Sequence, residues 1–404
     1  MKLIELLFIS KCKFTFATPP KITKPIQQHS DFCILSFFFL YIVSMHNDRN
    51  TNDILKGRGA QLNTKNKFSK HKLVTEHIEG LDEPLELNHS TEYFIEHPKK
   101  MINKVDSPDL NMSFSMNPYQ GCEHGCIYCY ARNTHPYWGF SAGLDFETKI
   151  VVKPDAAKLL DAEFRKKSWK PASIMFSGNT DCYQPAERKW KITRAMLEVA
   201  LNFRNPVGMI SKNQLILRDM DILKQMAELN LVHVMISITS LDEDLRLKLE
   251  PRTATAKNRL KVVETLNANN IPTGVMVAPI IPGLNSHEIP AIVEAAANAG
   301  ARGAGMTIVR LNDAVGEIFT DWIRKAYPDR AEKVLHAIAS CHGGKMNDSR
   351  FGLRMKGSGS EAEMIHQLFK NSMKRFFAGR SFPDYDLSHF RRPEVNGQLG
   401  LFDS

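Results

Sequence analysis

Three of the seven cysteines in this 404-residue chain lie in one short stretch, NPYQGCEHGCIYCYAR, at residues 117–132. Cys122, Cys126 and Cys129 follow a CxxxCxxC spacing. Thiolates are strong ligands for zinc and iron, so this crowding predicts a metal centre. Because Glu123 and His124 lie between these cysteines, we do not expect a buried apolar cluster of thiols.

Two other roles of these thiols, as ligands of structural zinc and as disulfide partners, have weaker support. A structural zinc site needs four ligands, and Cys182 and Cys341 are remote and form no second pair. Disulfides are disfavoured by the odd count and by the cytoplasmic location that we expect in the absence of an export signal. The chemistry that remains is an iron–sulfur cluster with three thiolate ligands, which leaves one iron open to bind another molecule.

Residues 1–44 differ in character from the rest of the chain. Their apolar run CILSFFFLYIVS, at residues 33–44, is shorter than the roughly 20 residues that cross a bilayer, and Met45 follows it directly. We interpret residues 1–44 as a leader outside the fold, produced by a start site placed too early. A weak membrane anchor is the alternative, and we expect no stable membrane association.

From about residue 110 onward, strand and helix patterns alternate, which predicts an α/β fold with a parallel sheet. The predicted strands are at residues 111–117, 172–178, 207–211, 231–240, 273–281 and 303–311. The predicted helices are at residues 192–203, 219–229, 256–268, 286–299 (with Asn285 as N-cap), 314–340 and 361–377. Six strand–helix units fall short of a closed eight-fold barrel of about 250 residues, so we expect a partial (β/α)6 TIM-type barrel.

Composition and pattern divide the chain into five parts. Residues 1–44 are the leader, and residues 45–110 an N-terminal extension. The partial barrel covers residues 111–312, and a helical C-terminal cap with a basic loop covers residues 313–380. Residues 381–404 are polar with few apolar positions, so we expect a flexible tail.

The cysteine motif, with an aromatic residue just before its last cysteine, resembles that of the radical S-adenosylmethionine (radical SAM) superfamily. From about Lys56 to Arg392 the chain is similar to the DNA-repair-photolyase-like branch, relatives of spore photoproduct lyase. The stretches KGRGA, NPYQGCEHGCIYCYAR, YQPAER and DSRFGLRMKG carry this similarity.

The resemblance implies two cofactors, a 4Fe-4S cluster on Cys122, Cys126 and Cys129 and SAM on the open iron. It implies that the cluster, reduced by a donor such as flavodoxin or ferredoxin, cleaves SAM to a 5′-deoxyadenosyl radical. This radical abstracts hydrogen from substrate C–H bonds. In this chemistry the cofactor supplies the reactive species and the protein orients it.

The resemblance also assigns residues to SAM. Tyr128 would lie near the adenine, with simple packing as its alternative role. The loop after the second strand would meet the amino group through Ser177, Gly178, Asn179, Thr180 and Asp181. The alternative for Asp181 is to cap the following helix.

Residues at later strand ends complete the implied SAM site. Lys212 and Arg252 would bind the SAM carboxylate, with a solvated lysine and an ion pair between Arg252 and Glu250 as the alternatives. Ser237 and Thr239 would contact ribose or carboxylate. The backbone of Ile280 would frame the adenine.

One departure argues against lyase activity on spore thymine dimers. Gly178 stands where spore photoproduct lyase has the cysteine that returns a hydrogen atom to its product. Cys182 follows Asp181 instead, and is a candidate hydrogen-atom donor at the mouth of the site or, alternatively, a buried thiol.

Two further features indicate partners. The net charge of +9 permits an anionic partner, and the loop at residues 341–360 holds Lys345, Arg350, Arg354 and Lys356 around Phe351. This composition suits nucleic acid, although a solvated basic loop is the alternative. The terminal QLGLF resembles the pentapeptide with which bacterial repair and replication proteins dock on the DNA sliding clamp. Its anchors are Gln398, Leu399, Leu401 and Phe402, unless the tail folds back on the barrel.

These features together predict a radical SAM enzyme that acts on nucleic acid in DNA repair or modification. One alternative is radical SAM modification of a protein or small metabolite. An alternative of another class is a non-enzymatic nucleic-acid-binding module that holds zinc or a cluster.

Overall fold

A sheet of seven strands forms the centre of the fold. The computed structural model describes residues 57–68, 90–110 and 112–394. The sheet order is β10-β9-β8-β7-β6-β3-β2, and only β2 runs antiparallel to its neighbour. The strands are β2 (Asn103–Lys104), β3 (Phe114–Met116), β6 (Ile174–Phe176), β7 (Val207–Ser211), β8 (Val232–Ser237), β9 (Thr273–Ile280) and β10 (Ala304–Ile308). All six predicted strands are confirmed, and the sheet stays open between β10 and β2.

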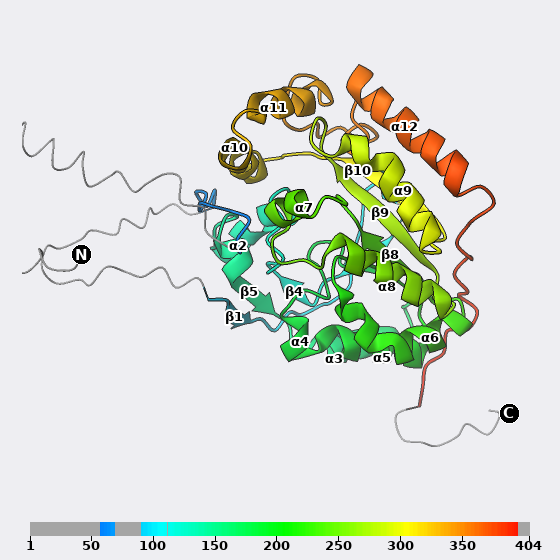
Figure 1. Ribbon diagram of the computed structural model, residues 1–404. Helices are drawn as coiled ribbons and strands as arrows, with labels where there is room; N and C mark the ends of the chain where they lie inside the picture. Colours follow the sequence, from blue (N-terminus) through cyan, green and yellow to red (C-terminus); the bar gives the residue numbers. More distant parts are fainter. Residues whose placement is uncertain (1–56, 69–89, 111, 395–404) are drawn as a thin grey trace, which may run out of the picture. The chain divides into compact units, whose positions relative to one another are not determined.

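Helices connect the parallel strands and cover the outer face of the sheet (Figure 1). They are α3 (Ala156–Arg165), α4 (Glu187–Trp190), α5 (Ile192–Phe203), α6 (Met220–Glu228), α8 (Ala256–Ala268) and α9 (Ile289–Asn298), with 3-10 turns η2 (Gln214–Asp219) and η3 (Ser286–Glu288). The short helix α7 (Glu243–Leu249), between β8 and α8, packs instead against the cysteine loop. In α5 the predicted apolar stripe is buried, including Met196, Ala200 and Phe203. This arrangement is the expected partial (β/α)6 barrel.

Asn285 holds the N-cap position of η3, at the start of the predicted helix, but the capping role of its side chain is wrong. Its side chain makes no capping bond, and the 3-10 turn η3 precedes α9. Instead Asn285 accepts a hydrogen bond from Ile281 N at 2.6 Å and donates to the carbonyl of Thr239 at 2.8 Å. The side chain therefore ties the end of β8 to the loop after β9.

A second, three-stranded sheet has the order β1-β5-β4 and was not predicted from the sequence. Its strands are β1 (Glu92–Ile95), β4 (Tyr119–Gln120) and β5 (Lys149–Val152). The 3-10 helix η1 (Tyr130–Trp138) and the short helix α2 (Asp145–Thr148) lie between β4 and β5 in the chain. Since β4 ends just before Cys122, this sheet fixes the start of the cysteine loop, and part of the N-terminal extension belongs to the same fold.

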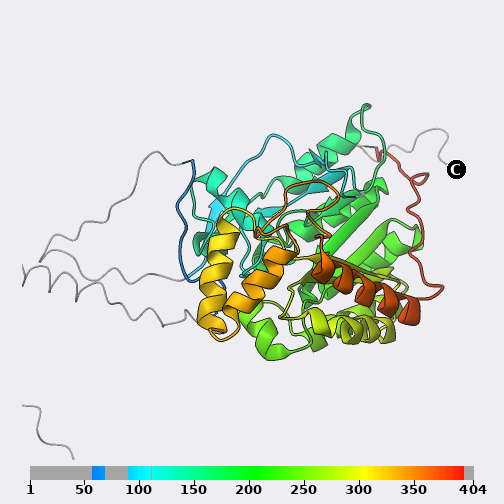
Figure 2. The same ribbon diagram turned by 90° about the horizontal axis from the view of Figure 1, so that it is seen from above.

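Three helices follow β10, namely α10 (Ala314–Ala326), α11 (Ala331–Ser340) and α12 (Ser360–Phe376). The helix predicted at residues 314–340 is thus two helices, because Pro328 and the restricted residue before it end the first. The last helix, α12, packs against α9 and β10 at the open edge of the sheet (Figure 2). None of the helices in the described residues has the length and apolar character needed to span a membrane.

The expectation of a flexible tail is wrong for residues 381–394, which pack along the barrel. The Tyr385 ring stacks on His233 of β8 with centroids 3.9 Å apart, and the Tyr385 hydroxyl donates to the carbonyl of Val207 at 3.3 Å. Farther on, the side chains of Arg391 and Arg392 donate to main-chain carbonyls of α5, α3 and Trp169. Most of these contacts are hydrogen bonds to main-chain carbonyls rather than apolar packing. The apolar content of residues 381–394 therefore did not predict that this segment is bound to the barrel.

Candidate active site

The cysteine loop lies at the carboxyl edge of the central sheet, next to the loops that follow β6, β7 and β8. His124 lies 3.3 Å from Asp181 after β6, and also 3.3 Å from Asn213 after β7. The amide of Ile127 donates to the carbonyl of Leu249, at the end of α7, at 3.0 Å. The strand ends that a parallel sheet brings to one edge thus surround the three cysteines.

The three thiols form a compact donor set. All are free, Cys122 and Cys126 are buried, and Cys129 is partly exposed. Burial raises the pKa of each thiol, and the negative charges of the other two and of Asp181 raise that of Cys122 further. As metal ligands these thiols must lose their protons, and the positive charge of a bound metal centre would favour the thiolate form.

The chemistry of the donor set is that of iron–sulfur proteins, in which thiolates are the usual ligands. Within the described residues, no three His, Cys, Asp or Glu side chains are placed to hold one metal ion. A four-iron cluster instead takes one thiolate on each ligated iron, so its ligands lie farther apart than those of one ion.

The N-terminal strap (residues 57–68) supports the cysteine loop from outside the sheet. Its amides at Gly59 and Ala60 donate to the Glu147 carboxylate at 3.0 and 2.7 Å. Glu147 pairs with Arg132 at 2.5 Å, and Arg132 Nε donates to the carbonyl of Cys126 at 3.0 Å. No local sequence pattern predicts this network, because Glu147 lies 88 and 87 positions from Gly59 and Ala60 in the chain.

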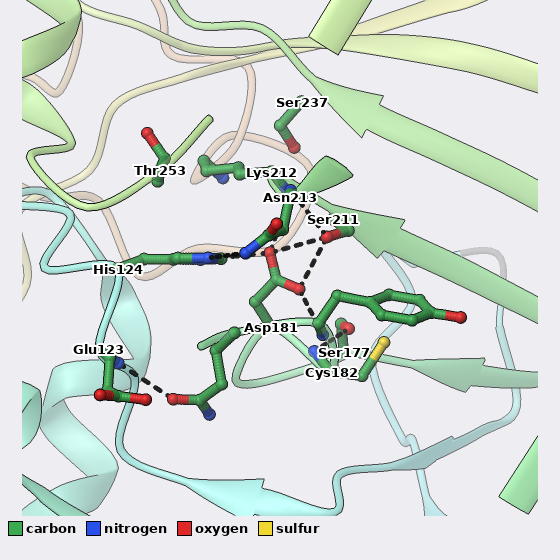
Figure 3. Close-up of polar contacts among 12 residues, drawn as sticks. Glu123, His124, Ser177, Asp181, Cys182, Ser211, Lys212, Asn213, Ser237 and Thr253 are labelled. Carbon is green, nitrogen blue, oxygen red and sulfur yellow. Dashed lines mark hydrogen bonds and ion pairs between the residues drawn. The ribbon is translucent and has the colours of Figure 1, made fainter. Parts of the chain in front are cut away.

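Asp181 is held by protein donors (Figure 3). Ser211 Oγ donates to its two oxygens at 2.9 and 3.1 Å, and Lys212 N donates at 2.8 Å. His124 Nδ1 lies 3.3 Å away, and although burial alone would raise the pKa of Asp181, this imidazole and the backbone donors lower it. Asp181 caps no helix, since α4 has no side-chain cap. The carboxylate joins three loops, and most of its acceptor capacity is already used.

The rest of the β6 loop also bonds to the protein. Ser177 Oγ accepts from Cys182 N at 2.8 Å, and Gly178 O accepts from the Tyr130 hydroxyl at 2.7 Å. The side chain of Asn179 donates to Gln120 at 2.9 Å, and that of Thr180 donates to the carbonyl of Tyr119 at 2.7 Å. This loop is therefore a rigid wall of the site.

Lys212 and Ser237 keep their polar groups uncommitted at the ends of β7 and β8 (Figure 3). Neither Lys212 Nζ nor Ser237 Oγ has a hydrogen-bond partner among the residues that the structure describes. Burial would lower the pKa of Lys212, but the negative charges of Cys126 and Glu250 raise it overall. These are the predicted site residues best placed to bind an anionic ligand group.

Tyr128 and Thr239 belong to a buried network around Glu250. The Tyr128 hydroxyl donates to the Glu250 carboxylate, and Thr239 Oγ1 donates to it at 2.6 Å. Arg259 pairs with the same carboxylate and donates to the carbonyl of Ser237 at 2.9 Å. Burial opposes ionisation of Glu250, yet the cations of Arg259 and Lys212 lower its pKa to about 2. Sequence analysis missed Arg259 and the central role of Glu250.

Arg252, Ile280 and Cys182 make contacts within the protein, and the roles of Arg252 and Ile280 toward SAM stay predictions. The ion pair suggested between Arg252 and Glu250 is wrong, because Arg252 lies 3.7 Å from Glu123. Ile280 is fully buried, and its carbonyl accepts from Val309 N at 2.8 Å. The Cys182 thiol is fully buried in the main core rather than at the mouth of the site, which favours the alternative of a buried thiol.

The basic loop packs on the segment before β3. Arg354 pairs with Asp109 and lies 4.5 Å over the exposed Phe351 ring, and Arg350 pairs with Asp348 at 2.6 Å. A second contact between an arginine and an exposed ring lies beside the cysteines, where the Arg310 guanidinium is 5.7 Å from the Tyr130 ring.

Comparisons with known proteins agree with this fold and site. Residues 116–296 match the family model of the radical SAM superfamily. The uncharacterized protein Rv2578c of Mycobacterium tuberculosis is 31% identical over 234 residues, which is 57% of this chain and 69% of the relative. The uncharacterized protein MJ0683 of Methanocaldococcus jannaschii is 29% identical over 186 residues, 46% of this chain and 66% of the relative.

Among solved structures, spore photoproduct lyase complexed with dinucleoside spore photoproduct has a similar fold. The TM-score is 0.52 at 15% identity, over 75% of this chain and 86% of that one. This chain belongs to the radical SAM superfamily and is an enzyme of that class. The cofactors of the superfamily are a 4Fe-4S cluster and SAM.

Proposed function

We propose that Cys122, Cys126 and Cys129 hold a 4Fe-4S cluster and that the enzyme reductively cleaves SAM. The observation that carries this proposal is the position of three free thiols, two of them buried and that of Cys129 partly exposed, in one loop at the carboxyl edge of a parallel sheet. When bound and reduced, such a cluster with SAM supplies a 5′-deoxyadenosyl radical, which removes hydrogen from C–H bonds.

The chain's own residues bind and orient. The Lys212 ammonium supplies a positive charge for a carboxylate, and the Ser237 hydroxyl supplies a donor at the next strand end. The bonded β6 loop and the Glu250 network keep these groups in fixed positions, so little ordering is needed when the ligand arrives.

Nucleic acid is the substrate class that the surface favours. Tyr130 with Arg310 and Phe351 with Arg354 each combine an exposed ring with a guanidinium, which suits stacked bases and phosphates. The similar fold of spore photoproduct lyase, solved with a dinucleoside, adds support. We further propose a cytoplasmic location, reduction by a flavodoxin or ferredoxin, and docking on a DNA sliding clamp. The clamp motif, at residues 398–402, lies outside the described residues.

Anaerobic reconstitution with iron and sulfide tests the proposal. The expected result is a brown protein that produces 5′-deoxyadenosine from SAM with dithionite. Protein that stays colourless and retains zinc after the same treatment would contradict it, and would favour a non-enzymatic binding module.

A further inference from the structure

The Gln184 side chain bonds to the main chain on both sides of Cys122. Its Nε2 donates to the carbonyl of Gly121 at 3.0 Å, and its Oε1 accepts from Glu123 N, also at 3.0 Å. Gln184 is fully buried and comes from the YQPAER stretch after β6. One amide group therefore spans the peptide units before and after a candidate ligand.

The remaining main-chain bonds of this segment point to the same function. Cys122 N donates to the carbonyl of Phe146 at 2.9 Å. Gly121 has a φ of 77°, and a Cβ there would lie 2.9 Å from the carbonyl oxygen of Lys149. On the β5 side the main chain of residues 121–123 bonds to Phe146 and lies close to the carbonyl of Lys149, and on the β6 side its hydrogen bonds, among the described residues, come from Gln184.

Both hydrogen bonds, to the carbonyl of Gly121 and from the amide of Glu123, require an amide side chain of this length. Glutamate would keep the acceptor for Glu123 N, lose the donor to Gly121 O and bring a negative charge next to the thiols. Asparagine is shorter by one methylene and could not reach both groups from the same backbone position. Loss of the side chain leaves a buried donor and a buried acceptor on either side of Cys122 unpaired, which destabilises this segment.

We infer that Gln184 is a positioning residue that orients the Cys122 thiol toward the cluster. This inference rests on the proposed cluster. It gives a role to the glutamine of the YQPAER stretch, which the function proposed above leaves without one. Gln184 acts through the main chain of Cys122 and contacts no cofactor itself.

The test compares Gln184→Ala with Asn205→Ala in the full-length protein. Asn205 is also fully buried, and its amide donates to the carbonyls of Ala172 and Pro206 and accepts from Trp169. It therefore matches Gln184 in burial and bonding, but it lies at the start of β7, at the opposite end of that strand from the site. Both variants should lose similar thermal stability.

The distinguishing readouts are iron per chain and the EPR spectrum of the reduced protein. We expect about four irons in the wild type and in Asn205→Ala, and at least a twofold loss with altered g values in Gln184→Ala. Gln184→Glu, checked for folding by circular dichroism, should also change the spectrum. Wild-type iron content and spectrum in both Gln184 variants would overturn the inference. A wild-type protein that gathers no iron would instead overturn the proposed function.

Discussion

Gly59 of the N-terminal strap lies against the carbonyl of Gly125 in the cysteine loop. A Cβ on Gly59 would stand 1.8 Å from Gly125 O and 3.3 Å from Glu147 Oε1. No side chain fits this space, so the contact requires glycine. Two segments separated by a long stretch of chain thus touch at the centre of the candidate site.

Gly59→Ala should therefore force the strap away from the loop. The bonds from Gly59 N and Ala60 N to the Glu147 carboxylate would break, and hydrogen bonds to charged groups contribute about 1.5–3 kcal/mol each. We expect the free energy of unfolding, measured with urea, to fall by about 3–5 kcal/mol.

The control is Gly57→Ala in the same strap. A Cβ there meets nothing within 4 Å, although the φ of 74° makes alanine strained. This strain should cost only about 1–2 kcal/mol. An equal loss in the two variants would show that the contact with Gly125 does not matter.

Replacing Cys122, Cys126 or Cys129 by alanine should abolish iron binding and cleavage of SAM. Each thiol is one of three candidate ligands, so its loss leaves only two thiolates for the cluster. Iron per chain after anaerobic reconstitution is the measurement. Cys182→Ala and Cys341→Ala should keep the wild-type iron content, since both thiols are buried elsewhere. Complete loss of iron in Cys182→Ala would refute the three-ligand site.

The sequence predicted the parts of the fold that follow a period. The six parallel strands and α5 carry apolar residues at regular spacing, and burial makes that spacing visible. β5, at Lys149–Val152, is short and belongs to a second sheet whose partners are far apart in the chain. No local sequence pattern predicts the pairing of strands so far apart in the chain.

The candidate site was predictable to a similar degree. The cysteines were predictable from residue type and spacing, because three thiols in a CxxxCxxC pattern are typical of metal ligands. Whether a polar side chain faces a ligand or a neighbour depends on contacts between loops, as Asp181 shows with its donors from Ser211, Lys212 and His124. Such contacts are set by tertiary structure and leave no local signal.

If the basic loop binds nucleic acid, affinity should fall steeply with salt. Replacing Arg350 and Arg354 together by alanine should reduce the slope of log K against log[salt] by about 2, one unit for each lost phosphate contact. Filter binding to a single-stranded oligonucleotide between low and moderate salt measures the slope.

A variant of α10 provides the control for that charge change. Arg324 is 59% exposed and pairs with Glu332 at 2.9 Å, as Arg350 pairs with Asp348. Arg324→Ala should leave the slope unchanged. Equal slopes in the wild type and the double variant, or no binding at low salt, would show that this loop is a solvated basic loop that does not bind nucleic acid.

His135 should make the fold sensitive to acid. Burial lowers the pKa of its imidazole to about 4 from an ordinary value of 6.5, and Nε2 lies 3.1 Å from the carbonyl of Asp145. Below pH 6.5 the unfolded chain binds a proton that the folded chain does not, so stability falls as the pH decreases toward 4. Between pH 8 and pH 5 this difference amounts to about 2 kcal/mol.

Urea unfolding at pH 8 and pH 5 of the wild type and of His135→Gln measures this effect. Glutamine keeps a donor for the Asp145 carbonyl but does not titrate, so the variant should lose about 2 kcal/mol less over this range. The same pH dependence in both proteins would assign the acid sensitivity to other groups.

The last prediction concerns the end of the chain. Arg392 donates to the carbonyls of Phe164, Lys166 and Trp169, and Pro393 O accepts from Arg165, so residues up to this point are held on α3 and the segment after it. This anchor lies before β6, away from the cysteine loop at the other end of that strand. A partner bound just after it would leave the candidate site open.

A peptide of residues 393–404 should bind a purified bacterial sliding clamp with micromolar affinity, about −8 kcal/mol. Phe402→Ala should remove most of this affinity, because the ring is the largest apolar group of the motif, whereas Ser404→Ala should not change it. If neither the peptide nor the full-length protein binds the clamp, the QLGLF resemblance is coincidental, and the case for a DNA substrate falls back on the exposed rings and arginines beside the site.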